Sequence, residues 1–94
     1  MEVNLQKCIA FTTVVECGSF TKAAERLSYS QSGVSRMIAD LETEWKINLL
    51  ERHKGGVRLT SDGTKVLPYV KSLCTEYDKL RMRVDEINGL QSGL

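Results

Sequence analysis

The marks of membrane, secreted and metal-binding proteins are missing from this sequence. No apolar run approaches the ~20 residues that a membrane-spanning helix needs, and no basic segment followed by an apolar core begins the chain. The cysteines Cys8, Cys17 and Cys74 are an odd number without Cys-x-x-Cys spacing, so neither a disulfide framework nor a zinc site is indicated. We therefore expect a cytoplasmic protein that has unpaired thiols and binds no membrane, metal or cofactor.

Catalytic motifs are missing as well. The only histidine, His53, has no cysteine or carboxylate partner at the spacing of metal ligands. The chain shows no Gly-rich phosphate loop, no nucleophile elbow and no helical pair of histidines. An enzyme is therefore not expected.

The chain also lacks an excess of positive charge. Its 13 Lys and Arg residues face 12 Asp and Glu residues, and this net charge of +1 argues weakly against nucleic acid as a partner. The distribution is uneven, however, because basic residues gather at Lys22, Arg26 and Arg36 and again at Arg52, Lys54 and Arg58. Acids gather instead at Asp40, Glu42, Glu44 and Glu51. The charge is therefore polarised although it nearly cancels.

What the 94 residues do contain is helical periodicity, of a length that suits one small domain. A first helix is indicated by Leu5, Cys8, Ile9, Thr12 and Val15, with Phe11 at the edge of its apolar face, and Gly18 can end it. Ser19 caps a second helix of about two turns, in which the apolar residues are Phe20, Ala23, Ala24 and Leu27. After a turn at residues 28–30, Ser30 caps a third helix that runs to about Trp45. This order predicts a helix-turn-helix.

The third helix has two unlike faces. Its apolar face consists of Val34, Met37, Ile38, Leu41 and Trp45. The opposite face consists of Gln31, Ser32, Ser35, Arg36 and Ala39. The first face is typical of a protein core, whereas the second is small and hydrogen-bonding and can lie close to another surface.

Two short extended runs follow, around a predicted turn at Gly55-Gly56, and they indicate a two-stranded wing with a basic tip. Thr60 is the next N-cap, and residues 61–88 predict a helix roughly 42 Å long. Apolar residues recur along it at heptad spacing, at Val66, Val70, Leu73, Tyr77, Leu80, Val84 and Ile87. A domain of this size cannot cover the far half of such a helix, so a partner helix is implied, although packing on the first helix alone remains an alternative.

The residues 18–27, Gly-Ser-Phe-Thr-Lys-Ala-Ala-Glu-Arg-Leu, and 30–36, Ser-Gln-Ser-Gly-Val-Ser-Arg, resemble the N-terminal domain of LysR-type transcriptional regulators. Residues 49–52, Leu-Leu-Glu-Arg, residues 56–60, Gly-Val-Arg-Leu-Thr, and Gly63 look like the wing and the start of the linker helix of that family. The chain departs from the pattern at Gly33, where alanine is usual, at Met37, where a polar residue is common, and at Trp45-Lys46, which replaces a leucine-glycine pair and so removes the expected glycine cap.

The resemblance implies a mainly helical fold with a small β wing, a winged helix-turn-helix in residues 1–60 and a dimerisation (linker) helix in residues 61–89. Residues 90–94 would be the stub of a hinge to a missing effector domain, which alone would bind a small-molecule effector. The resemblance further implies a homodimer that pairs through antiparallel linker helices, with a higher oligomer as an alternative for the full-length protein. Such a dimer would regulate transcription by reading an interrupted palindrome in promoter DNA.

The resemblance assigns base reading to Gln31, Ser35 and Arg36, whose side chains suit adenine and guanine edges. Ser32, at the start of the third helix, faces an anion naturally. Candidate phosphate contacts are Thr21, Lys22 and Ser30, together with Arg52, Lys54 and Arg58 on the wing. Each of these residues is alternatively an ordinary solvated side chain.

Two other functions compete with this interpretation. A winged helix can serve as a protein-interaction module that assembles through its coiled coil. It can also bind DNA without regard to sequence, but that role predicts more positive charge than +1. The small outer face of the third helix and the basic wing favour DNA over a protein partner.

Overall fold

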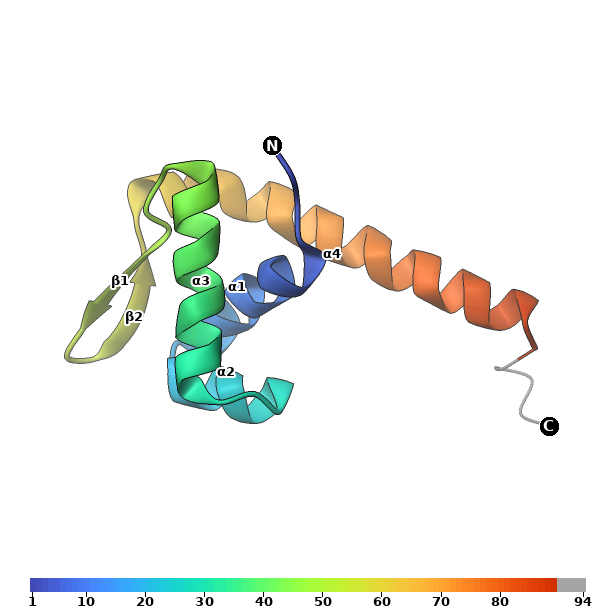
Figure 1. Ribbon diagram of the computed structural model, residues 1–94, viewed down its shortest axis with the longest axis horizontal. Coiled ribbons are helices and arrows are strands. Elements are labelled where there is room, and N and C mark those ends of the chain that lie inside the picture. The colour runs from blue at the N-terminus through green and yellow to red at the C-terminus, as the bar shows by residue number, and fades with distance from the viewer. Residues whose placement is uncertain (90–94) are drawn as a thin grey trace.

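The computed structural model describes residues 1–89, which form four helices and one hairpin (Figure 1). The elements are α1 (Leu5–Cys17), α2 (Phe20–Leu27), α3 (Gln31–Trp45), β1 (Leu50–His53), β2 (Gly56–Leu59) and α4 (Ser61–Ile87). Helices α1 to α3 pack together, the hairpin extends beside α3, and α4 passes α1 and projects beyond the other elements. The predicted mainly helical fold with a small β wing is confirmed, while the predicted hinge at 90–94 lies outside the described residues.

Each helix begins at a polar residue that accepts a hydrogen bond. The side-chain oxygens of Asn4, Ser19, Ser30 and Thr60 each accept from the backbone N–H three residues later. These bonds satisfy N–H groups that have no partner within the helix. The caps predicted at Ser19, Ser30 and Thr60 are therefore confirmed.

Three helices end at a residue in the left-handed region. Gly18, Ser28 and Lys46 have φ values of 66°, 61° and 60°. The ending predicted at Gly18 is confirmed. At Trp45-Lys46 the expected glycine is absent, but the geometry of the cap is kept, because Lys46 adopts the left-handed conformation itself and donates its N–H to the Glu42 carbonyl. A side chain in this conformation costs roughly 1–2 kcal/mol, which the surrounding packing must offset.

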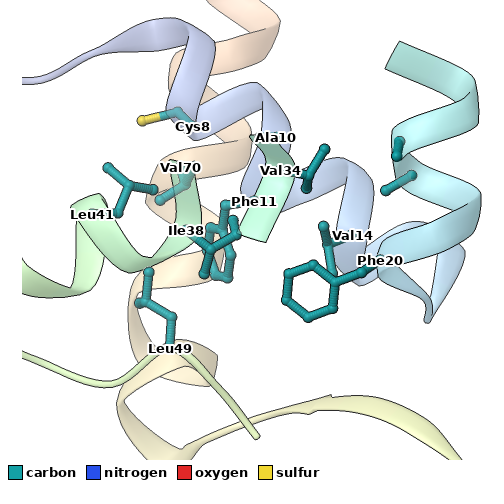
Figure 2. Packing of buried hydrophobic residues seen from close by; sticks show 12 residues of the cluster. Cys8, Ala10, Phe11, Val14, Phe20, Val34, Ile38, Leu41, Leu49 and Val70 are labelled. Carbon is teal, nitrogen blue, oxygen red and sulfur yellow. The ribbon is translucent and has the colours of Figure 1, made fainter. Parts of the chain in front are cut away.

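The core lies where α1, α2, α3 and the start of α4 meet (Figure 2). Its largest fully buried side chains are Phe11, Leu41, Leu49, Val14, Val34 and Cys8. The apolar faces predicted for α2 and α3 are confirmed at Phe20, Ala23 and Ala24 and at Val34, Ile38 and Leu41.

The apolar face predicted for α1 needs correction. Ala10, Phe11 and Val14 are fully buried, whereas the predicted core residues Ile9 and Val15 are only half-buried. Helix α1 contacts α2, α3, α4 and β2, so it is covered on several sides. The sequence pattern predicts one apolar face that packs on one side, and this assumption misplaces the centre of the buried face of α1.

The wing is a β-hairpin with a two-residue loop. Its strands pair antiparallel with Leu50 opposite Leu59 and His53 opposite Gly56, so the turn is Lys54-Gly55 and not the predicted Gly55-Gly56. Gly56 has a different role, as the first residue of β2. A Cβ there would lie 2.7 Å from the carbonyl oxygen of Gly18, and φ is 129°. Glycine is therefore needed where the wing approaches the turn between α1 and α2.

Helix α4 is fixed to the loop before β1. Thr60 donates its backbone N–H to the Leu49 carbonyl at 3.0 Å, and Gly63 packs directly on that carbonyl. The 27 residues of α4 correspond to roughly 40 Å, most of the 49 Å length of the molecule. Within residues 1–89, no helix combines the length and apolar character needed to cross a membrane.

Candidate nucleic-acid interface

The first half of α3 presents a polar surface away from the core. Gln31, Ser32 and Arg36 are exposed and Ser35 is half-buried, while Val34 on the opposite side is fully buried. The predicted division of this helix into two faces is confirmed. The surface contains hydrogen-bonding groups without bulky apolar side chains, and it leaves space for a close approach.

The end of α3 that carries this surface also meets the start of α2. The Thr21 hydroxyl lies 3.3 Å from Gln31 Oε1 and donates to it. The hydroxyls of Ser30 and Ser32 lie 3.3 Å apart. Polar side chains from two helices are therefore brought together here, and exposed Lys22 of α2 adds a positive charge at the same end.

Arg52 reaches the same surface from β1. Its Nη2 donates to Ser35 Oγ at 2.6 Å, and its Cζ lies 4.0 Å from the centroid of the Phe20 ring. Arg52 therefore lies on the wing, as the sequence indicates, and its side chain is directed toward α2 and α3. Among Arg52, Lys54 and Arg58, only Arg52 has an interaction with α2 and α3.

The tip of the wing is exposed, whereas Leu50, Val57 and Leu59 are half-buried and pack against the core. Arg58 Nη2 lies 3.4 Å from Glu51 Oε1 on the paired strand, whereas Lys54 occupies the turn. His53 Nδ1 accepts the backbone N–H of Gly55 at 3.2 Å. His53 therefore has a structural role in the turn, while Lys54 has no carboxylate partner within residues 1–89.

The acidic side chains in the second half of α3 are engaged by other groups. Lys7 of α1 pairs with Glu44 at 3.2 Å and with Asp40 at 3.5 Å, and the hydrogen bond to Glu44 is the main cause of the raised pKa of Lys7. Glu42 Oε2 accepts the backbone N–H groups of Leu49 at 2.7 Å and Leu50 at 3.3 Å. Positive charge therefore predominates around the first half of α3.

Arg36 is the one basic residue of α3, and it is highly exposed. Its side chain is 83% exposed, and Nε lies 3.9 Å from Asp40 Oδ1 one turn along the helix. An exposed pair at this separation contributes little to stability. The guanidinium is therefore available to another molecule at small cost.

A second surface lies along α4, and it differs from the predicted seam. The exposed apolar residues there include Tyr69 (75%), Leu73 (43%), Leu80 (61%), Val84 (44%) and Ile87 (76%). Val70 is 3% exposed and belongs to the protomer core, so the expectation that it awaits a partner was wrong. Val66 and Tyr77 are half-buried. We call the five exposed residues the α4 stripe.

Tyr69 was missed by the heptad spacing. At 100° per residue, Tyr69, Leu80 and Ile87 lie within about 20° of one another around the helix, whereas Val70 lies about 100° away. The angular positions of the residues around α4 would have identified Tyr69 from the sequence. The predicted spacing of four and three residues includes Val70 because a heptad pattern does not reveal which side α1 covers.

The α4 stripe leads into an apolar hollow of about 340 Å³ at the base of α3. Its walls include Trp45, Ile47, Val66, Tyr69 and Leu73. Trp45 Nε1 is buried and has no hydrogen-bond partner within residues 1–89. The hollow is therefore a second place, besides the first half of α3, where another molecule could gain contacts.

Comparison with known proteins gives a consistent result. A family described as "Bacterial regulatory helix-turn-helix protein, lysR family" matches residues 5–64. The chain is 42% identical over 79 residues to the HTH-type transcriptional regulator CzcR of Bacillus anthracis, covering 84% of this chain and 27% of that protein. It is 38% identical over 91 residues to the probable HTH-type transcriptional regulator LrrA of Synechococcus elongatus, covering 97% of this chain and 31% of that protein.

Solved structures show the same likeness. OxyR of Corynebacterium glutamicum in its oxidized form has a TM-score of 0.88 at 32% identity, over 95% of this chain and 27% of that chain. A BenM_DBD/catB site 1 DNA complex has a TM-score of 0.83 at 36% identity, over 92% of this chain and 97% of that chain. The chain spans about a quarter of the length of the CzcR relatives that it matches.

Proposed function

This chain belongs to the lysR family of bacterial regulatory helix-turn-helix proteins, and from that membership we propose that it is the DNA-binding part of a transcription regulator that reads a specific sequence in double-stranded DNA. The observation that carries the proposal is the first half of α3. It is polar and uncovered, and unpaired or weakly paired cations surround it. The structural similarity to a BenM domain in complex with DNA supports the proposal.

In this proposal α3 enters the major groove, which is wide enough for a helix. Gln31, Ser35 and Arg36 reach base edges. Thr21, Lys22, Ser30 and Ser32 hold phosphates, because they lie at the starts of α2 and α3, where free backbone N–H groups favour an anion. Lys54 and Arg58 contact the flanking backbone, and Arg52 acts closer to α3.

We further propose that two copies pair through α4. In an antiparallel pair, the end of each α4 lies against the first half of the other, so Val84 and Ile87 of one copy approach the hollow of the other. Each apolar side chain of the α4 stripe would gain very roughly 1.5–3 kcal/mol on full burial. Two linked reading helices would then bind an interrupted palindrome.

The remaining proposals concern the whole protein. This chain spans 27% and 31% of the length of the CzcR and LrrA relatives, and we propose that a longer form carries an effector domain that binds a small molecule. Residues 1–60 would bind DNA, residues 61–89 would pair the copies and residues 90–94 would lead to that domain. A cytoplasmic location, as for the DNA that it would bind, is part of the same proposal.

The test is selection from a library of random-sequence duplexes, followed by salt titrations on the selected and scrambled duplexes. Arg36→Ala should cost about 1–3 kcal/mol on the selected duplex and reduce discrimination, because only groups at base edges distinguish sequences. Lys54→Ala should weaken binding to all duplexes about equally. It should also make the salt dependence shallower by about one unit for each phosphate that is no longer neutralised, or two in a dimer.

The outcomes separate the candidate functions. Retention of no duplex would favour the protein-interaction module and overturn the proposal. Retention without any sequence preference would favour architectural DNA binding. If Arg36→Ala lowers both affinities in parallel, Arg36 holds the backbone and base reading belongs to Gln31 and Ser35.

A further inference from the structure

Arg52 is fixed at two points by the helix-turn-helix. One face of its guanidinium lies over Phe20, a ring that is only 7% exposed and therefore held by the core. Its Nη2 donates to Ser35 Oγ at 2.6 Å. No carboxylate within residues 1–89 forms an ion pair with Arg52, in contrast to Arg26, Arg36 and Arg58. The planar group is thus oriented by a ring and a hydroxyl rather than by an opposite charge.

This contact determines the direction of the Ser35 hydrogen bond. A guanidinium only donates, so Ser35 Oγ is the acceptor in the bond to Arg52. The hydroxyl hydrogen must therefore point elsewhere. Serine and threonine within helices often donate it to a carbonyl one turn back, as Thr13 does to Ile9 and Thr64 does to Thr60. Ser35 makes no such bond within residues 1–89, so its hydrogen is available on the outer side of α3.

We propose that Arg52 is a positioning residue that makes Ser35 a hydrogen-bond donor toward DNA. Ser35 then reads an acceptor on the major-groove edge, which is a purine N7, guanine O6 or thymine O4, and does not accept from the amino group of cytosine or adenine. Donation from a charged group also polarises the hydroxyl and strengthens its own donation. This inference rests on the proposed function, because it concerns how the same helix reads its site.

The first part of the experiment uses the random-sequence duplex library with the full chain and two variants. Ser35→Ala should relax one base pair in each half-site, with a loss of discrimination of roughly 5- to 150-fold at that pair. Arg52→Lys should relax the preference at the same base pair while the salt dependence of binding stays unchanged. Lysine keeps the positive charge but lacks the planar guanidinium and its forked N–H donors. The double variant should lose no more discrimination than Ser35→Ala alone, because both substitutions remove the same hydrogen bond to the base.

The second part tests the direction of the bond with modified bases at that base pair. Acceptors are removed with 7-deazapurine for N7 and weakened with 6-thioguanine for guanine O6 and 4-thiothymine for thymine O4, and the cytosine donor is blocked with N4-methylcytosine. Removal or weakening of one acceptor should lower the affinity of the unmodified chain toward that of Ser35→Ala and leave the affinity of Ser35→Ala unchanged. If N4-methylcytosine is instead the modification that weakens binding, Ser35 accepts and the inference is wrong.

Controls distinguish positioning from a loss of folding or charge. Arg26→Lys makes the same change at an exposed arginine of α2 whose partner is Glu16, at 2.9 Å, and it should leave every base preference unchanged. Thermal denaturation of each variant detects a loss of fold, which would lower all affinities in parallel. An Arg52→Lys variant that keeps the preference of the unmodified chain overturns the inference, even if Arg36→Ala still relaxes another base pair and so supports the proposed function.

Discussion

Gly63 and Gly33 are a matched pair in which the same substitution should have effects of very different size on stability. Each is the third residue of its helix, and each donates its backbone N–H to the capping hydroxyl, at 2.9 Å to Thr60 and 3.0 Å to Ser30. A Cβ at Gly63 would collide with the Leu49 carbonyl oxygen and lie 3.1 Å from Leu59 Cδ2. A Cβ at Gly33 would meet only the Ser30 hydroxyl, at 2.9 Å.

The collision at Gly63 cannot be relieved cheaply. Leu49 is fully buried, and its carbonyl accepts the Thr60 N–H at 3.0 Å, so α4 can move away only if this bond breaks. Overpacking costs about 1–3 kcal/mol and an unsatisfied buried carbonyl costs a similar amount, whereas alanine regains about 1 kcal/mol of helix propensity. We expect Gly63→Ala to lower the free energy of unfolding by about 3 kcal/mol, from a total of roughly 5–14 kcal/mol for a chain of this length.

Gly33→Ala has the same gain in propensity, and its cost is limited to a shift of the Ser30 side chain. That cap contributes about 1 kcal/mol, so the two effects nearly cancel. Thermal denaturation followed by circular dichroism, at one protein concentration, measures both variants. At about 4–8 °C per kcal/mol, Gly63→Ala should lower the Tm by about 12–24 °C and Gly33→Ala by far less. A Gly63→Ala variant that melts at or above Gly33→Ala would refute the reasoning.

Three further predictions concern the α4 stripe, the thiols and Lys7. Leu80→Asp should yield monomers in sedimentation and weaken DNA binding. The control Met82→Asp, on the opposite side of α4, should leave the dimer and its DNA binding intact. A wild-type chain that is monomeric at micromolar concentration would contradict the pairing. Burial raises the pKa of Cys8 and Cys74, so both thiols should stay protonated at neutral pH. They should react with iodoacetamide only at a higher pH than the same thiols in the urea-unfolded chain. Mass measurement should find neither a disulfide nor zinc. The pKa of Lys7 is raised, so its ion pairs stabilise the fold fully below the pKa of lysine in the unfolded chain, and this stabilisation is lost as the pH rises through the pKa of Lys7 in the folded chain. Lys7→Met should remove that loss of stability at alkaline pH, whereas the control Lys79→Met should keep it. Equal pH profiles of stability for the two variants would contradict the role of Lys7.

Local chemistry explains which parts of the fold could be predicted from the sequence. The caps at Ser19, Ser30 and Thr60 depend on bonds to residues three positions away, and all of them are found. The faces of α2 and α3 could be predicted because each helix has one covered side. The face of α1 could not, because α1 lies among the other helices and is buried on several sides.

The candidate site was predictable in composition but not in arrangement. The exposed residues of α3 follow from its periodicity, since Val34 and Leu41 must face the core. The bond from Arg52 to Ser35 joins residues 17 positions apart and depends on how the hairpin lies against α3, which no local pattern specifies. The exchange of Val70 for Tyr69 in the α4 stripe has a similar cause, because the position of α1 decides which side of α4 is left uncovered.

The loop before β1 connects the two proposed functions of the chain. Glu42 of α3 accepts the N–H groups of Leu49 and Leu50, so the second half of the reading helix is bonded to this loop. Thr60 donates to the Leu49 carbonyl, and Gly63 packs on the same group, so the start of α4 is bonded to the loop as well. The angle between α3 and α4 is therefore fixed within one protomer. If two copies pair through α4, the separation of their reading helices follows from this angle and from the register of the pair. The spacing of the half-sites would then be a property of buried backbone contacts, while the choice of bases depends on the exposed side chains of α3.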